Sequence, residues 1–152
     1  RPPPISTLFP STTLFRSKEE INKYFKTYLS LTNLTIKDTQ FDVKPYYEMS
    51  DLILNLSNPK LIIETFGLTI LEGMSYGLPA IVPPIGGISE IVDDGIEGFH
   101  VNVNNFDYLV ECINKILKNE NIYNEMSKNA LKKSLEFNVK NYINQIDGYI
   151  NT

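Results

Sequence analysis

Two glutamates, Glu64 and Glu72, flank a short step, Phe66 to Thr69 (FGLT), that has the features of a helix start. A helix N-terminus presents unpaired N–H groups and the positive end of the helix dipole, so it can hold a phosphate without an arginine. Gly67 would let such a ligand approach the backbone closely, because glycine has no side chain. The sequence therefore predicts a phosphate site at this step.

The two carboxylates suit the groups that flank a phosphate in a nucleotide sugar. Glu72 falls about one and a half turns inside the helix, at ~3.6 residues per turn, where it can accept two hydrogen bonds from the vicinal diol of a ribose. Glu64, in the loop before the helix, can reach a sugar hydroxyl on the other side of the phosphate. The spacing alone is weak evidence, since it fits equally well two solvated acids that the helix dipole favours.

Short apolar runs and amphipathic segments alternate around this step, as expected of strands and helices joined by short loops. The alternation predicts an α/β fold, a Rossmann-like parallel sheet with helices on both faces. The predicted strands are residues 52–56, 79–82 and 98–103, with a further short one at 34–36. The predicted helices are residues 18–31, 45–49, 67–76, 88–92, 105–117, 122–135 and 139–150.

Particular residues set the ends and faces of these helices. Asn105 is predicted to cap the helix that follows it, and Gly77 to end the helix that begins at Gly67. The latter helix is predicted to turn Leu68, Leu71 and Met74 inward. The inward face predicted for 105–117 consists of Phe106, Leu109, Val110, Ile113, Ile116 and Leu117.

Several residues that could do chemistry are better explained by packing. Cys112 lies at helical spacing from apolar neighbours, so it is expected to be a buried apolar side chain rather than a nucleophile. His100 has no partner at metal-ligand spacing, and neither metal binding nor general-base work is expected of it. Tyr46 and Tyr47 could stack on a nucleobase, but packing in the core or beside the site is the simpler expectation. The Lys132-Lys133 pair is expected to form a solvated helix face.

Length and charge exclude some classes of protein. At 152 residues the chain is one ordinary domain, and no run approaches the ~18 apolar residues of a membrane span. No secretory signal is recognisable, so a cytoplasmic location is predicted. From Lys18 onward twelve lysines face eighteen acidic residues, a net charge of −6. A chain this acidic, without a basic stripe, is not expected to bind nucleic acid.

Residues 1–17 differ in composition from the rest, holding four of the nine prolines and both arginines. The run LFPSTTLFRS resembles the translation of a sequencing-library adapter. We therefore expect residues 1–17 to be a non-native segment and exclude them from the fold prediction, which leaves 18–152 as the domain. The alternative is a genuine, proline-rich and disordered leader.

Three blocks around the two glutamates occur together and in a fixed order: ETFGLTILEGMSYGLPAIV, PPIGGISEIV and DGIEGFHV. They resemble the C-terminal, donor-binding domain of the group 1 (family 4) retaining glycosyltransferases, enzymes of the two-domain GT-B fold. The resemblance extends from about Tyr47 to Leu117 and is less specific beyond. It implies a partial nucleotide-sugar-binding domain, here the last third of such an enzyme.

The resemblance also assigns roles to residues. Glu64 is implied as the catalytic residue, in contact with hydroxyls of the donor sugar, and Glu72 as the ligand of the nucleotide ribose. The Gly-Gly-x-x-Glu block that ends at Glu90 is implied to be structural. The implied donor-binding residues are Glu64, Phe66, Gly67, Leu68, Thr69 and Glu72.

The implied reaction uses a nucleotide-diphosphate sugar, UDP- or GDP-linked, without a metal or other cofactor. Its acceptor would be a polysaccharide or glycoconjugate. The family supplies an arginine, a lysine and an N-terminal acceptor domain from segments before Lys18, so this chain by itself is expected to be inactive. Peripheral association of the full enzyme with a membrane stays open. The alternatives are a nucleotide-sugar epimerase of the same fold and a non-catalytic nucleotide-binding module.

Overall fold

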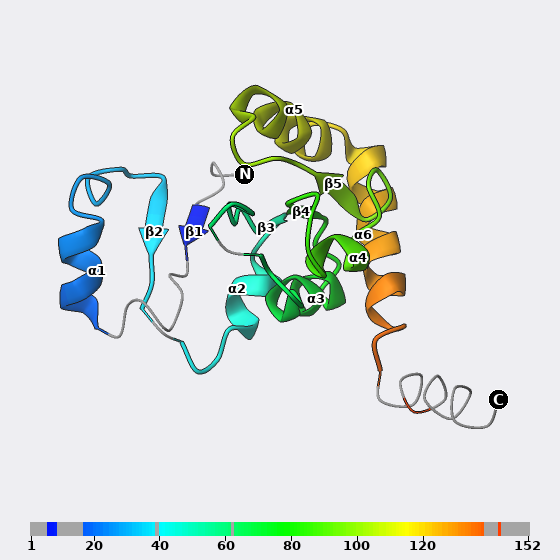
Figure 1. The fold of residues 1–152 in the computed structure, drawn as a ribbon, viewed down its shortest axis with the longest axis horizontal. Helices are drawn as coiled ribbons and strands as arrows, with labels where there is room; N and C mark the ends of the chain where they lie inside the picture. Colours follow the sequence, from blue (N-terminus) through cyan, green and yellow to red (C-terminus); the bar gives the residue numbers. More distant parts are fainter. Residues whose placement is uncertain (1–5, 9–16, 39, 62, 139–142, 144–152) are drawn as a thin grey trace. The chain divides into compact units, whose positions relative to one another are not determined.

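A computed structural model describes residues 6–8, 17–38, 40–61, 63–138 and 143 of the chain. The chain divides into two compact units, residues 1–46 and 47–152 (Figure 1). The predicted last helix, 139–150, falls almost entirely outside the described residues. None of the helices in the described ranges combines the length and apolar character needed to cross a bilayer.

The first unit contains α1 (Lys18–Tyr24) and two paired strands, β1 (Ser6–Leu8) and β2 (Leu34–Ile36). The strands run parallel, with Thr7 opposite Thr35. The strand predicted at 34–36 is thus confirmed, while β1 lies within the segment 1–17 that the fold prediction left out. Whether that segment is native stays a prediction.

Helix α1 begins with a capping box in which Ser17 and Glu20 exchange hydrogen bonds with each other's backbone N–H. It ends at Tyr24, shorter than the predicted 18–31. Ile21 is buried, but Tyr24, Tyr28 and Leu29, which would form an apolar stripe with Ile21 on the predicted 18–31 helix, are exposed. Because tertiary packing supplies most of a helix's stability, a stripe that buries only Ile21 does not sustain the longer helix.

The second unit is built on a three-stranded parallel sheet in the order β3-β4-β5. Ala80 in β4 lies opposite Ile53 in β3 and Gly98 in β5. This sheet confirms the predicted α/β class, with shorter strands than the sequence suggested. The elements are α2 (Lys44–Glu48), which spans the division between the units, β3 (Ile53–Leu54), α3 (Leu68–Ser75), β4 (Ala80–Val82), α4 (Ile88–Ile91), β5 (Gly98–His100), α5 (Phe106–Leu117) and α6 (Glu120–Ser134).

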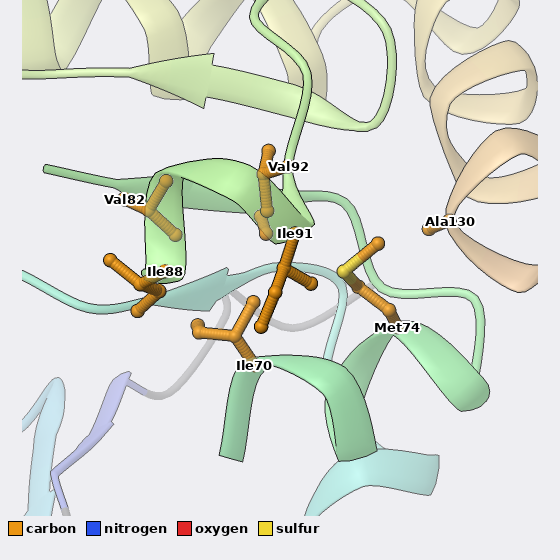
Figure 2. Packing of buried hydrophobic residues seen from close by; sticks show 8 residues of the cluster. Ile70, Met74, Val82, Ile88, Ile91, Val92 and Ala130 are labelled. Carbon is orange, nitrogen blue, oxygen red and sulfur yellow. The ribbon is translucent and has the colours of Figure 1, made fainter. Parts of the chain in front are cut away.

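Alternation along β4 sends its side chains into two separate cores, which places helices on both faces of the sheet as predicted. Figure 2 shows Ile70 and Met74 of α3 rising toward Val82, Ile88 and Ile91. On the other face Ile81 packs with residues of β5, α5 and α6. That second core comprises Ile81, Phe99, Val101, Leu109, Cys112, Ile116 and Met126. Burying one such aliphatic side chain contributes about 1.5–3 kcal/mol.

The predicted helix ends are confirmed where polar caps or glycine set them. The Asn105 side chain accepts a hydrogen bond from the Tyr108 N–H at 3.3 Å, capping α5. Gly77 follows α3 with a φ of +76°, a conformation that favours glycine. Asn119 caps α6 in the same way, so this helix begins at Glu120 rather than at the predicted Ile122.

Two helix faces were predicted correctly only in part: Leu71, Met74, Leu109, Ile113 and Ile116 pack in the cores as expected, and other residues do not. Leu68 is exposed, and Ile70, not Leu68, joins Met74 in the core. The rotation follows from Gly73, which lies against Ile53 of β3 and allows a close approach that a larger side chain would block. On α5 the buried positions are Leu109, Cys112 and Ile116, whereas Phe106, Val110 and Leu117 are exposed.

Candidate functional site

The loops that follow β3 and β4 meet through their backbones beside the start of α3. A Cβ atom on Gly87 would overlap the carbonyl oxygen of Thr65, and one on Gly86 would lie 2.5 Å from the carbonyl oxygen of Glu64. Gly86 also has a φ of +101°, which L side chains rarely adopt. The glycine pair therefore fixes the chain at Glu64 and Thr65 at the carboxyl end of the sheet, the edge where α/β folds bind ligands.

The start of α3 leaves its first backbone donors open. Gly67 is the N-cap, and no side chain accepts a hydrogen bond from the first turn, which contains no acidic residue. Gly67 is buried, and a Cβ there would lie 2.6 Å from Cγ1 of Ile88. Phe66, Leu68 and Thr69 are exposed around these donors. The start of α3 is thus an accessible helix N-terminus, and that it holds a phosphate stays a prediction.

Glu64 precedes the cradle in the loop after β3. Its side chain is half-buried, and the described residues offer its carboxylate no hydrogen bond. Between Lys60 and Lys115 the sequence contains no lysine or arginine, so no cation comes from this stretch. A half-buried carboxylate without a partner beside open N–H donors can accept hydrogen bonds from a ligand hydroxyl.

Glu72 lies in the middle of α3, with its side chain exposed. The hydroxyl of Tyr47 donates a hydrogen bond to its Oε2 atom at 3.0 Å. The Tyr47 ring packs on Tyr76 with centroids 5.4 Å apart, which confirms the packing expected of Tyr47. Sequence reasoning missed the contact between Tyr47 and Glu72, because 25 positions separate the two residues and no local pattern connects them.

Burial raises the pKa of the Tyr47 hydroxyl well above its ordinary value, and the hydrogen bond to Glu72 raises it further. Both causes disfavour a tyrosinate beside a carboxylate. Tyr47 therefore remains a donor at physiological pH, and the Glu72 carboxylate is its acceptor.

A second group of polar side chains lies in the turn between α4 and β5, residues 93–97, here called the acidic turn. Glu97 is buried and its Oε2 accepts the Asp93 N–H at 2.7 Å. Asp94 accepts the His100 N–H at 2.7 Å. The Nε2 atom of His100 lies 2.6 Å from the Val92 carbonyl oxygen and is its donor. His100 is thus engaged in holding the turn, and that it is neither a metal ligand nor a general base stays a prediction.

Lys133 of α6 completes the acidic turn with an ion pair to Asp93, Nζ to Oδ2, at 2.9 Å. Its side chain is only 19% exposed, so the expectation that both Lys132 and Lys133 are solvated is wrong for Lys133. The pair joins positions 40 apart, beyond the reach of a local sequence pattern. Within the described part of the chain, no three His, Cys, Asp or Glu side chains are grouped so as to hold a metal ion. That the reaction needs no metal stays a prediction.

A hollow of about 240 Å³ lies elsewhere, between the acidic turn, β5, α5 and α6. Both Lys115 and Phe99 line this hollow, and the Lys115 Nζ atom lies over the Phe99 ring, 4.9 Å from the ring centroid. Residues 64–72 are called the entry segment below. The hollow shares no residue with this segment. Its lining is Gly95, Phe99, Lys115, Ile122, Glu125 and Met126.

With the geometry of the entry segment established, comparison with known proteins identifies the family. Residues 17–133 match the sequence profile of the glycosyl transferases of group 1. The chain belongs to this family. The match includes both units' described helices up to α6 and the whole entry segment, and it confirms the resemblance found in the three sequence blocks.

Curated relatives of this glycosyltransferase chain are much longer than it is. It is 34% identical over 119 residues to the N-acetyl-alpha-D-glucosaminyl L-malate synthase of Bacillus anthracis, covering 74% of this chain and 30% of that one. It is 38% identical over 79 residues to sucrose synthase 6 of Arabidopsis thaliana, covering 49% of this chain and 8% of that one. The chain therefore spans less than a third of either relative.

Solved structures confirm the fold of this glycosyltransferase chain as that of GT-B enzymes. The structure of Anabaena Alr3699/HepE in complex with UDP-glucose superposes with a TM-score of 0.79 at 23% identity, covering 99% of this chain and 42% of that one. The C-terminal domain of a group 1 glycosyl transferase from Francisella tularensis superposes with a TM-score of 0.62 at 18% identity, covering 79% and 61%. Neither comparison tests the roles of Glu64, Glu72 or the residues between them, which stay predictions.

Proposed function

We propose that this chain supplies the donor half of the site in a retaining glycosyltransferase that moves a sugar from a nucleotide-diphosphate sugar to a polysaccharide or glycoconjugate acceptor. The observation that carries the proposal is the open N-terminus of α3 between two carboxylates, Glu64 without a partner among the described residues and Glu72 held by Tyr47. A solved relative of this fold has UDP-glucose bound, which supports a nucleotide sugar as the ligand class.

Each group of the proposed ligand has a counterpart in the entry segment. The diphosphate would lie against the N–H groups that open α3, with the Thr69 hydroxyl as a further donor. The Glu72 carboxylate would accept hydrogen bonds from the ribose diol. Glu64, fixed by the backbone contact with Gly86, would accept them from hydroxyls of the donor sugar.

In the proposed reaction the acceptor hydroxyl attacks the anomeric carbon from the face that the diphosphate leaves. The bond from this carbon to the phosphate oxygen breaks as the new glycosidic bond forms. A departing phosphate oxygen takes the acceptor's proton. The N–H groups of α3 would stabilise the charge on the leaving diphosphate, and Glu64 would hold the sugar in place for attack.

The rest of the enzyme is part of the proposal. We infer an N-terminal domain that binds the acceptor, a cytoplasmic location and no requirement for a metal or other cofactor. By itself this chain is expected to transfer no sugar at a useful rate, because the acceptor site and the cationic groups near the phosphate would come from that additional part. A transfer rate comparable with that of complete enzymes would refute this expectation.

Calorimetric titration of the chain with UDP, GDP and ADP tests the proposed function. One of the nucleotides should bind, and Glu72→Ala should weaken it by at least about tenfold, as expected for the loss of hydrogen bonds to a charged group. Glu64→Ala should weaken the binding of the matching nucleotide sugar but leave the affinity for the free nucleotide unchanged. The donor-site assignment would be refuted if no nucleotide binds, or if Glu72→Ala leaves the affinity unchanged.

A further inference from the structure

The side chain of Glu72 is exposed, so without a partner it would be free to adopt many conformations. Three rotatable bonds let an unpaired carboxylate occupy many positions, and ordering a glutamate side chain costs conformational entropy. A ligand that needs both oxygens of this carboxylate would have to supply that ordering. The Tyr47 hydroxyl donates the one hydrogen bond that the described residues give this carboxylate, at 3.0 Å to Oε2.

Tyr47 is itself fixed in place. Its ring packs on Tyr76 at an interplanar angle of 30°, and Tyr76 lies one helical turn after Glu72 on the same side of α3. The hydroxyl also lies 3.5 Å from the carbonyl oxygen of Thr69, one turn before Glu72. The side chain of Tyr47 therefore bridges three successive positions along one face of α3.

The hydrogen bond from Tyr47 orients the Glu72 carboxylate but leaves most of its acceptor sites open. A carboxylate offers about four lone-pair sites, and Tyr47 takes one of them on Oε2. The remaining sites, including both on Oε1, stay open in a fixed plane, as a pair of neighbouring hydroxyls requires.

We propose that Tyr47 is a positioning residue that orients the Glu72 carboxylate and thereby determines selectivity for the two ribose hydroxyls of the nucleotide. This inference rests on the proposed function, because it refines how the same site recognises its ligand. Tyr47 acts through Glu72 and does not contact the ligand. Its effect must therefore disappear when the ribose hydroxyls are absent.

The test compares UDP with 2′,3′-dideoxyuridine diphosphate as ligands of the intact chain, or the corresponding pair if GDP is the nucleotide that binds. Tyr47→Phe keeps the ring on Tyr76 and removes only the hydroxyl. This substitution should weaken the binding of UDP about fivefold and leave the affinity for the dideoxy ligand unchanged. Tyr46→Phe is the matched control, since it removes a hydroxyl from the same helix that bonds to Gln40 instead. It should change neither affinity.

A second variant guards against a folding defect in Tyr47→Phe. Tyr76→Leu removes the ring on which Tyr47 packs but keeps both interacting groups, and it should give a smaller loss that is again confined to UDP. Equal weakening of both ligands, or wild-type affinity of Tyr47→Phe for UDP, would overturn the inference. If Glu72→Ala abolishes UDP binding while Tyr47→Phe has no effect, the proposed function stands and only the role of Tyr47 falls.

Discussion

The acidic turn and the entry segment are both rich in carboxylates, yet they use them differently. In the acidic turn every acidic side chain has a partner from the chain itself: Asp93 pairs with Lys133, Asp94 with the His100 N–H and Glu97 with the Asp93 N–H. In the entry segment Glu64 has none among the described residues, and Glu72 has Tyr47 alone. Both segments lie in the same unit and join a helix to neighbouring strands.

The difference separates acids that hold the fold from acids that are available to a ligand. A hydrogen bond to a charged group contributes about 1.5–3 kcal/mol, and a carboxylate engaged in this way is not free for other partners. The family profile covers both segments, so family membership alone does not say which acids bind the donor. Their partners in the structure show which carboxylates the chain itself engages. The comparison therefore predicts opposite effects of mutation in the two segments.

The largest effect is expected at Gly98, where β5 leaves the acidic turn. A Cβ atom there would overlap the backbone of Ala80, its partner in β4. Because strand backbones cannot separate without breaking the ladder, Gly98→Ala should lower the free energy of unfolding by at least about 3 kcal/mol. Urea denaturation measures the change.

Gly95 in the same turn is the control for Gly98. It has a φ of +81°, but a Cβ added to it would meet no other atom within 4 Å, so Gly95→Ala should cost only about 1–2 kcal/mol. If Gly98→Ala proves as stable as Gly95→Ala, the close contact between the strands is not what sets this end of the sheet.

The next largest effect is expected at Glu97. Its side chain is buried, and Glu97→Ala would remove the acceptor of the Asp93 N–H, at a cost of about 2–3 kcal/mol in the free energy of unfolding. Glu111→Ala, an exposed glutamate on α5, is the matched control and should stay within about 0.5 kcal/mol of the wild type. A loss at Glu97 no larger than at Glu111 would show that the buried carboxylate does not hold the turn.

A smaller effect is expected at Lys133. Because Asp93 is about half exposed, the ion pair should contribute only about 0.5 kcal/mol, measured as the difference between Lys133→Ala and the control Lys132→Ala. The hydrogen bond to Asp93 raises the pKa of the Lys133 ammonium above its ordinary value near 10.5. A group whose pKa rises on folding stabilises the fold below the unfolded-state value and loses that contribution as the pH climbs through the folded-state value.

The difference between the two lysine variants should therefore be constant from neutral pH to about 10 and should vanish at higher pH. Unfolding midpoints in urea across this range measure it. A difference that grows with pH would contradict the assignment of the pair.

The sequence predicted those features that local patterns determine. The open start of α3 at Gly67 and the caps at Asn105 and Gly77 depend on residues within one turn, and all three are confirmed. On the inward face of α3 only Leu68 was predicted wrongly, because Gly73 works as a packing position only through Ile53, which lies in a different element. Periodicity that counts apolar side chains does not detect such a glycine.

The partners of the acids were beyond sequence reasoning for a related reason. Glu72 meets Tyr47, and Asp93 meets Lys133, across 25 and 40 positions. Folding, not spacing, decides which carboxylates are engaged. The sequence predicted a ligand site in the entry segment, and the structure adds which groups of that segment have no partner among the described residues.

The central claim is that the entry segment's acids serve a ligand and those of the acidic turn serve the fold. Calorimetric titration of UDP into Glu72→Ala and Glu97→Ala, at a temperature where both are folded, tests it most directly. We expect Glu72→Ala to lose at least about tenfold in affinity, the equivalent of ~1.4 kcal/mol, and Glu97→Ala to bind as the wild type does. Equal affinities in the two variants, or a loss at Glu97 alone, would contradict the account.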